Sequence, residues 1–270
     1  MRPEPHYFFK SWEYKKGFEN YLTTWFAEAS PSAIAVGERS SSYLYGGREV
    51  ANRIHAALPQ VRLIFVLRNP VDRAWANYRY TVLQGLEHLS FMEALEQESS
   101  RKASAEGMWS EIQPHDYSGR SRYASQLRQY LEVFSSRNIL LLKSESLSTK
   151  TDVELNRVHE FLNVSAPARG YLREPDHHAL GVKCPRTQMQ CRQHFGDRFD
   201  AIIEAIRREE DFSALVNSAV DKEWAETLEA NLSRNRQDLP LEAQGFLRSA
   251  LADDLEILAG LVPFDVSDWQ

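Results

Sequence analysis

The sequence predicts an α/β fold in which a parallel sheet is flanked by helices and followed by a helical C-terminal part. Two apolar runs rich in branched residues, VRLIFVL (61–67) and NILLLK (138–143), have the length and composition of strands buried in a parallel sheet. Amphipathic segments of helical period lie between and after these runs. Strands that are joined by helical crossovers pair in parallel, and the alternation therefore favours an α/β sandwich.

The elements of the first part follow one another closely. A short apolar run, SAIAV, predicts a strand over about 33–37, and the segment 48–58 predicts a helix with one apolar face that ends before Pro59. The strand over 61–67 comes next, and an Asn-Pro pair breaks it. A further helix is expected over about 71–84.

The second part continues the alternation and then becomes helical. We expect a helix over 123–134, the strand over 138–143 and a helix that carries Leu155 to Leu162. From about Gln188 the pattern is mostly helical, with a last helix near 247–261. No linker-like stretch interrupts the chain, and we therefore expect a single domain over 1–270.

Composition narrows the classes of function. The 270 residues carry a net charge of −6, which argues against a general nucleic-acid binder but permits a local basic groove. Two cysteines are too few for a disulfide framework, and a zinc or other metal site is not expected. No run has the length of a membrane span. If Met1 is the true start, the lack of a signal peptide predicts a cytoplasmic protein.

The carboxyl ends of the predicted strands are the expected place for a ligand. Arg68 follows the strand over 61–67, and the helix after it would turn its amino end toward the same spot. A guanidinium group in this position suits a phosphate, which it can bind through two hydrogen bonds. The alternative is an ion pair with a carboxylate such as Asp72 or Glu38, and physical reasoning alone leaves both open.

Five segments in order resemble a known family. VLRNPVDRAWANYRYTV (66–82) resembles the 3′-phosphate-binding segment of the sulfotransferases that use 3′-phosphoadenosine 5′-phosphosulfate (PAPS). EPHYFF (4–9), GERSSSYL (37–44), the block at 120–147 and FLNV (161–164) resemble further segments of its glycan-type members, which include the heparan sulfate sulfotransferases and bacterial enzymes. The terminal DVSDW resembles a frequent bacterial ending, whereas about 186–245 resembles nothing that we can name.

This resemblance implies a fold like that of the P-loop NTPases, PAPS as the co-substrate, no metal, and a hydroxyl acceptor on a glycan, a lipid or a small metabolite. The family's phosphosulfate-binding turn, G-x-x-K-x-G-T-T, does not occur in the 270 residues, and neither does the strand before it. We therefore expect weak PAPS binding and turnover near background from this chain. The alternative is a truncated or degenerate homologue that binds an anion or a partner without catalysis. A P-loop kinase or GTPase is disfavoured for want of the same turn.

The resemblance also assigns roles near the N-terminus. Glu4 matches the general base that takes the proton of the acceptor hydroxyl, although a frayed terminal carboxylate is the alternative. His6 matches a polar residue of the acceptor site. Arg39 stands where the family usually has Lys, so it keeps the positive charge on the substrate side.

Further positions match the cofactor site. Arg68 matches the 3′-phosphate arginine, and Ala76 replaces its usual serine partner, which removes one hydrogen bond. Arg120 and Tyr123 match positions that line the cofactor. Lys183 and Arg186 are faintly similar to a late basic loop that closes over the cofactor, and an ordinary exposed loop is the alternative.

Overall fold

The computed structural model describes residues 4–167, 180–235 and 237–269, and its contacts divide the chain into two compact units. Unit 1 comprises 1–70, 120–172 and 251–270, and unit 2 comprises 71–119 and 173–250. Each unit is therefore formed by stretches that are not contiguous in the sequence. The expectation of a single domain over 1–270 stays a prediction.

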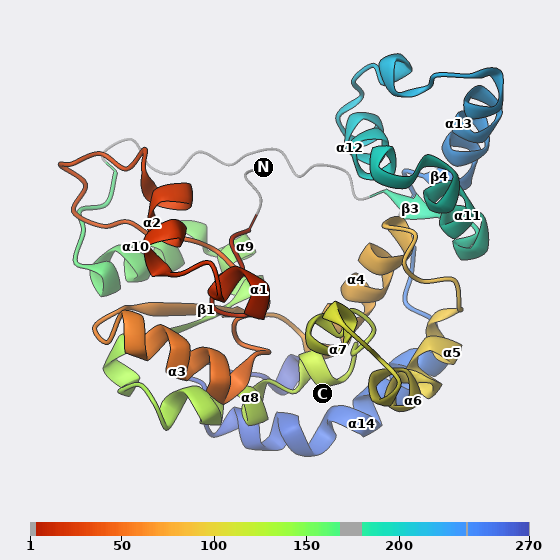
Figure 1. Ribbon diagram of the computed structural model, residues 1–270. Coiled ribbons are helices and arrows are strands. Elements are labelled where there is room, and N and C mark those ends of the chain that lie inside the picture. The colour runs from red at the N-terminus through yellow and green to blue at the C-terminus, as the bar shows by residue number, and fades with distance from the viewer. Residues whose placement is uncertain (1–3, 168–179, 236, 270) are drawn as a thin grey trace. The chain divides into compact units, whose positions relative to one another are not determined.

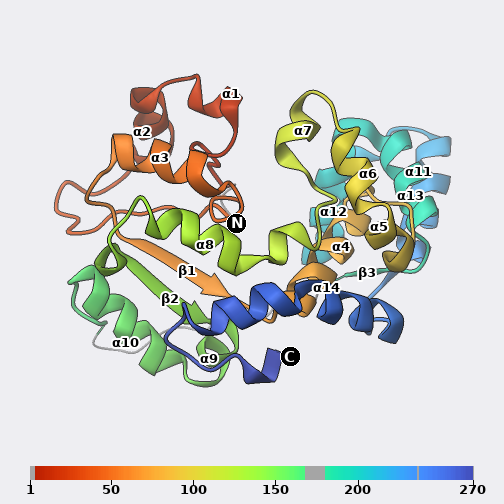
Figure 2. The same cartoon turned by 90° about the horizontal axis from the view of Figure 1, so that it is seen from below.

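Unit 1 contains the predicted parallel pairing. Strand β1 (Leu63–Leu67) pairs with β2 (Ile139–Lys143) in a register that runs from Leu63 opposite Ile139 to Leu67 opposite Lys143. Figures 1 and 2 show α3 (Gly47–Ala57) and α8 (Tyr123–Leu131) on one face of these strands, and α9 (Ser144–Thr149) and α10 (Thr151–Leu162) on the other. The parallel sheet with helices on both faces is confirmed.

The helices of unit 1 form where the sequence has apolar residues at helical spacing. In α3, Val50, Ala51 and Ile54 are buried on one face. In α8, Leu127 and Tyr130 are buried, and both join the core around the strands. Unit 1 also holds two short helices, α1 (Ser11–Tyr14) and α2 (Phe18–Phe26), and the 3₁₀ turns η2 (Ser136–Asn138) and η5 (Ser267–Trp269). The 3₁₀ turn η1 (Gly119–Ser121) begins at the last residue of a unit 2 stretch and continues into unit 1.

The strand that we expected over 33–37 is wrong. This segment carries no strand, and its two large apolar side chains, Ile34 and Val36, are 81% and 56% exposed. Between them stands only alanine, so the run offers little apolar surface to bury, and the described residues bring no other strand alongside it. Burial of β1 is also less complete than expected, because Val66 is 51% exposed.

The described residues of unit 2 are helical apart from one short antiparallel pairing of β3 (Gly181–Val182) with β4 (Leu232–Ser233). Its helices are α4 (Pro70–Leu83), α5 (Phe91–Glu96), α6 (Glu98–Ala103), α7 (Met108–Ile112), α11 (Pro185–Phe195), α12 (Phe199–Arg208) and α13 (Ala219–Asn231), with the 3₁₀ turns η3 (Gly196–Arg198) and η4 (Ser213–Leu215). The helix α14 (Leu241–Ala259) contributes its first part to unit 2 and its second part to unit 1. The prediction of a helical C-terminal part is confirmed.

The predicted helix boundaries agree with the structure to within about three residues, apart from the start of the last helix. The expected ranges 71–84, 123–134 and 247–261 correspond to α4, α8 and α14, of which α14 begins earlier than its apolar pattern suggested. Over the ranges that the structure describes, no helix combines the length and the apolar character that crossing a bilayer requires.

Candidate functional site

Glu4 lies at the centre of a polar cluster in unit 1. One of its carboxylate oxygens accepts two hydrogen bonds from Ser41, from the backbone N–H at 2.8 Å and from the hydroxyl at 2.7 Å. The Nε2 atom of His6 lies 3.2 Å from the same oxygen, and Nε of Arg39 lies 3.2 Å from the other. The structure thus brings together three residues that the sequence assigned to the acceptor side, and Glu4 is not a frayed terminal group.

The surroundings of Glu4 favour its ionised form. Burial alone would raise the pKa of this carboxyl group. The two hydrogen bonds from Ser41 and the charges of His6 and Arg39 outweigh burial, and the pKa lies below its usual value of 4.5. Glu4 is therefore an anion at neutral pH, which is the state that a proton acceptor requires.

His6 is held in an unusual backbone conformation. Its φ angle is +49°, in the left-handed region that residues other than glycine seldom adopt. The N–H of His6 donates to the hydroxyl of Ser40 at 2.9 Å, and its carbonyl accepts from the N–H groups of Phe9 and Lys10. Such strain persists where surrounding contacts impose it, and it concentrates at functional sites.

The imidazole of His6 is predominantly neutral at pH 7. Burial lowers its pKa below 6.5, the charges of Lys10 and Arg120 lower it further, and Glu4 acts in the opposite direction. Its Nδ1 atom is buried and has no hydrogen-bond partner within the described residues. Because Nε2 lies against a carboxylate, the neutral ring carries its proton there, and Nδ1 is an unused acceptor.

Two arginines supply positive charge near this cluster. Arg39 is mostly exposed, with 66% of its side-chain surface accessible, and reaches Glu4 from the rim. Arg120 is buried in η1, where its guanidinium lies over the ring of Tyr45 at 4.1 Å from the centroid. Its charge acts on His6. The sequence had assigned Arg120 to the cofactor side, and the structure places it within electrostatic range of the acceptor-side residues.

Arg68 lies at the carboxyl edge of the sheet, as expected. It directly follows β1, is exposed, and precedes the start of α4 by two residues. The N–H of Asn69 donates to Glu145, which follows β2, at 2.9 Å. The turns after the two strands are thus tied to each other beside Arg68.

The remaining predicted cofactor residues have different surroundings. Tyr123 is the first residue of α8 and is buried in the core of unit 1. Ala76 is half-buried on α4. Lys183 and Arg186 lie in unit 2, where both line a cavity of about 450 Å³ together with Trp75 and Cys184. The ammonium group of Lys183 donates to the carbonyl of Ala230 at 2.6 Å. The cofactor roles of these four residues stay predictions.

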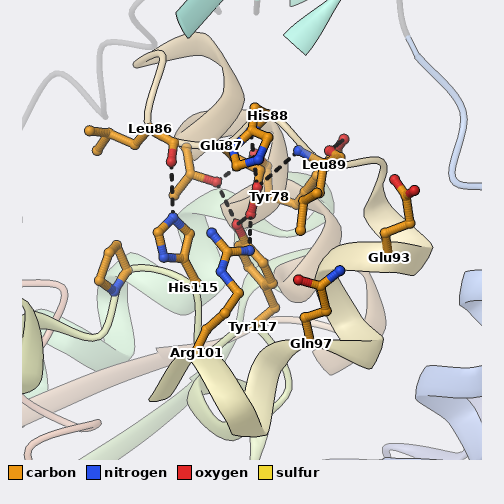
Figure 3. Close-up of polar contacts among 12 residues, drawn as sticks. Tyr78, Leu86, Glu87, His88, Leu89, Glu93, Gln97, Arg101, His115 and Tyr117 are labelled. Carbon is orange, nitrogen blue, oxygen red and sulfur yellow. Dashed lines mark hydrogen bonds and ion pairs between the residues drawn. The ribbon is translucent and has the colours of Figure 1, made fainter. Parts of the chain in front are cut away.

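A second buried polar cluster, in unit 2, surrounds Glu87 (Figure 3). One carboxylate oxygen accepts hydrogen bonds from Arg101 and from the hydroxyl of Tyr117, both at 2.7 Å. The other accepts the N–H groups of His88 and Leu89. Burial would raise the pKa of Glu87, but these donors outweigh it and lower the pKa. Every oxygen of this carboxylate is satisfied within the protein, and the cluster therefore stabilises the loop before α5.

Sequence reasoning missed Ser41 and Glu38 as members of the Glu4 cluster. Both lie in the GERSSSY segment, in which the sequence assigned a site role to Arg39 alone and indicated Glu38 as a possible partner for Arg68. Glu38 accepts hydrogen bonds from Tyr21, Ser40 and Tyr43. A run of serines beside a carboxylate, directly after an apolar stretch, was the available signal.

The fold and the arginine at the end of β1 define a class of proteins. A parallel sheet with an arginine and a helix start at the carboxyl end of a strand is typical of α/β proteins that bind anionic ligands. A family model described as "Sulfotransferase domain" matches residues 51–234, which is more than half of the chain. The chain therefore belongs to the sulfotransferase domain family, and the resemblance found in the sequence is confirmed.

Known proteins similar to this chain carry related names. The chain is 30% identical over 164 residues to the Homo sapiens heparan sulfate glucosamine 3-O-sulfotransferase 3B1, a match that covers 60% of this chain but 38% of the relative. It is 24% identical over 169 residues to the Homo sapiens bifunctional heparan sulfate N-deacetylase/N-sulfotransferase 2, covering 62% of this chain and 18% of that protein. The chain thus spans less than half the length of these relatives.

A solved structure supports the fold. The crystal structure of a sulfotransferase from Alicyclobacillus acidocaldarius matches with a TM-score of 0.53 and 24% identity, over 80% of this chain and 87% of the other. At this identity the likeness bears on the fold alone. Together with the β1–β2 pairing it confirms the sulfotransferase fold.

Proposed function

We propose that the protein transfers a sulfuryl group from PAPS to a hydroxyl group of a glycan. The observation that carries the proposal is the Glu4 cluster, in which an ionised carboxylate lies within 3.2 Å of both His6 and Arg39. The names of the heparan sulfate sulfotransferases favour a glycan over a lipid or a small metabolite. PAPS, when bound, supplies the sulfuryl group.

In this proposal Glu4 accepts the proton of the acceptor hydroxyl as the hydroxyl oxygen attacks the sulfur of PAPS, and the bond from sulfur to the 5′-phosphate oxygen breaks to release 3′-phosphoadenosine 5′-phosphate. The two hydrogen bonds from Ser41 keep Glu4 ionised and fix its orientation. His6, whose Nε2 lies 3.2 Å from the same carboxylate oxygen, orients Glu4 from a second side. Arg39 holds positive charge at the exposed rim, which suits an anionic glycan.

The residues present fit one end of PAPS better than the other. Arg68, exposed beside the start of α4, fits the 3′-phosphate, because a guanidinium and the positive end of a helix dipole both favour an anion. The family's turn for the phosphosulfate is not among the 270 residues.

Transfer of ³⁵S from labelled PAPS to a partly desulfated heparin tests the function. Glu4→Gln should lower kcat about 100-fold or more, because general-base catalysis contributes about 10²–10⁴-fold. Glu13→Gln is the matched control, since Glu13 lies in the same N-terminal segment and pairs only with Lys16 among the described residues. Equal transfer by wild type and Glu4→Gln would show that Glu4 is not the base.

A second candidate function is anion or partner binding without catalysis. Ala76 in place of the family's serine favours it. Binding of the desulfated product, 3′-phosphoadenosine 5′-phosphate, together with no detectable ³⁵S transfer to any glycan acceptor would support this candidate over the first.

A further inference from the structure

Glu38 is a half-buried carboxylate that joins three segments of unit 1. It accepts hydrogen bonds from the hydroxyl of Tyr21, on α2, at 3.4 Å and from the hydroxyl of Ser40 at 2.9 Å. The hydroxyl of Tyr43 also donates to it, and the same hydroxyl accepts the N–H of Phe8 at 3.3 Å. Glu38 thus ties α2 and the segment after Gly37 to the stretch that carries His6.

Ser40 connects Glu38 to His6 directly. A hydroxyl group has one proton to donate and two lone pairs that accept. Because the proton of Ser40 is directed at Glu38, a lone pair is left to accept the N–H of His6 at 2.9 Å. The orientation of this hydroxyl, and with it the contact to His6, depends on the carboxylate behind it.

The contact matters because His6 is strained. With φ at +49°, its backbone would relax to a commoner region if the N–H lost its acceptor. Relaxation would rotate the imidazole away from Glu4, whose oxygen now lies 3.2 Å from Nε2. A displacement of about 1 Å at a reacting group can cost as much as 10²-fold in rate.

We propose that Glu38 is a positioning residue for sulfuryl transfer, which acts through Ser40 to hold His6 against Glu4. The inference rests on the proposed function for its catalytic meaning, but the geometry it claims can be tested without turnover. Neighbouring Ser41 binds Glu4 itself, so the run from Glu38 to Ser41 would hold both acceptor-side residues.

The electrostatics of Glu38 agree with a role inside the protein. Burial raises the pKa of its carboxyl group, and the nearby Glu4 adds to this effect. The hydrogen bonds from Tyr43, Ser40 and Tyr21 act in the opposite direction. Keeping a carboxylate ionised in such surroundings lowers the free energy of unfolding, and the three hydrogen-bond donors offset this loss only in part.

The first test is an NMR titration of His6 in the wild type and in Glu38→Ala. The charged groups that act on His6 are Glu4, Lys10 and Arg120, and burial is the largest influence that lowers its pKa. If Glu38 holds His6 in place, the substitution frees the ring toward solvent, and the His6 pKa rises toward 6.5. An unchanged His6 titration in a folded Glu38→Ala protein overturns the proposal, whether or not the wild type transfers sulfate.

The second test distinguishes a positioning role of Glu38 from a general effect on the stability of the fold. Glu38→Ala and Ser40→Ala should each lower kcat at least about tenfold with little change in the KM for PAPS, and the double variant should lose little more than the larger single loss. If the losses in kcat of the two single variants multiply in the double variant, Glu38 and Ser40 act independently and the positioning role is contradicted. Losses in kcat that disappear after correction for the folded fraction would contradict it as well.

Glu49→Ala, on the exposed side of α3, is the matched control. If Glu38→Ala does not fold, the NMR titration of His6 is carried out in Ser40→Ala and Tyr21→Phe instead.

Failure of the proposed function is distinguishable from failure of this inference. A wild-type chain without transfer activity contradicts the function, whereas the His6 titration still decides whether Glu38 positions the ring.

Discussion

Ser41 donates both its backbone N–H and its hydroxyl to a single carboxylate oxygen of Glu4, a residue 37 positions away in the sequence. Two donors on one oxygen stabilise the ionised form more than the protonated form, because the protonated oxygen accepts less well. The pair therefore sets both the location and the protonation state of the candidate base. It also makes the first residues that the structure describes part of the folded unit.

We expect Ser41→Ala to raise the pKa of Glu4 toward its usual 4.5, because one of the two hydrogen bonds is lost. The lowered pKa means that Glu4 contributes to the free energy of unfolding above about pH 4.5, and this contribution is lost as the pH falls through the folded pKa. In Ser41→Ala this contribution should be smaller, and its loss, which begins near pH 4.5 in both proteins, should be complete at a higher pH. Carboxyl ¹³C titration by NMR measures the shift, with Ser32→Ala, in an exposed loop, as the control.

Arg101→Leu should destabilise unit 2 substantially. The substitution leaves the fully buried carboxylate of Glu87 without its cation, and breaking a buried ion pair costs about 3–5 kcal/mol. Because Arg101 keeps 20% of its side-chain surface exposed, we expect a loss near the lower end, about 3 kcal/mol. Urea denaturation at pH 7 measures it. Arg207→Leu, which breaks a surface pair with Glu204, should cost less than about 1 kcal/mol. Equal losses in the two variants would contradict this account.

The sequence predicted the parts of the fold that depend on local apolar patterns. The branched runs at 61–67 and 138–143 became β1 and β2, and the apolar faces of α3 and α8 lie where the spacing predicted. The run at 33–37 misled because apolar character alone does not make a strand. A strand also needs a neighbour to pair with and surface to bury, and both depend on tertiary structure.

The candidate site was predictable only in part. Glu4, His6 and Arg39 were found through the resemblance, and the structure brings them into contact. The contribution of Ser41 and Glu38 depends on a contact between segments more than 30 residues apart, which no local pattern encodes. The left-handed φ of His6 is equally hidden, because histidine gives no sequence signal for that conformation.

Asp254→Ala should destabilise unit 1 by about 1–2 kcal/mol. The carboxylate of Asp254, on α14, accepts the N–H of Ala124 at 2.9 Å and the N–H of Ser125 at 3.1 Å. These groups lie in the first turn of α8, where N–H groups have no partner within the helix, so a distant side chain caps it. The neighbouring Asp253 is exposed, and Asp253→Ala should change the free energy of unfolding by less than about 0.5 kcal/mol. Thermal and urea denaturation compare the two variants.

Arg68→Ala should weaken binding of 3′-phosphoadenosine 5′-phosphate tenfold or more. Arg68 is exposed at the carboxyl end of β1, beside the start of α4, and a hydrogen-bonded contact between charged groups contributes about 1.5–3 kcal/mol, which corresponds to at least tenfold in affinity. Isothermal titration calorimetry measures the dissociation constant without any need for turnover, so it applies to a catalytic and to a non-catalytic protein alike.

The control for Arg68 is Arg137, which is exposed just before the amino end of β2 and therefore lies at the opposite edge of the parallel sheet. Arg137→Ala removes the same charge from the same unit but leaves the carboxyl edge intact, and its affinity for the nucleotide should match the wild type within about twofold. Comparable weakening by both substitutions would mean that the protein attracts the nucleotide only through its general charge. Unchanged affinity in Arg68→Ala would show that the 3′-phosphate is held elsewhere, and Lys183 and Arg186, which line the cavity of unit 2, would then be the residues to substitute next.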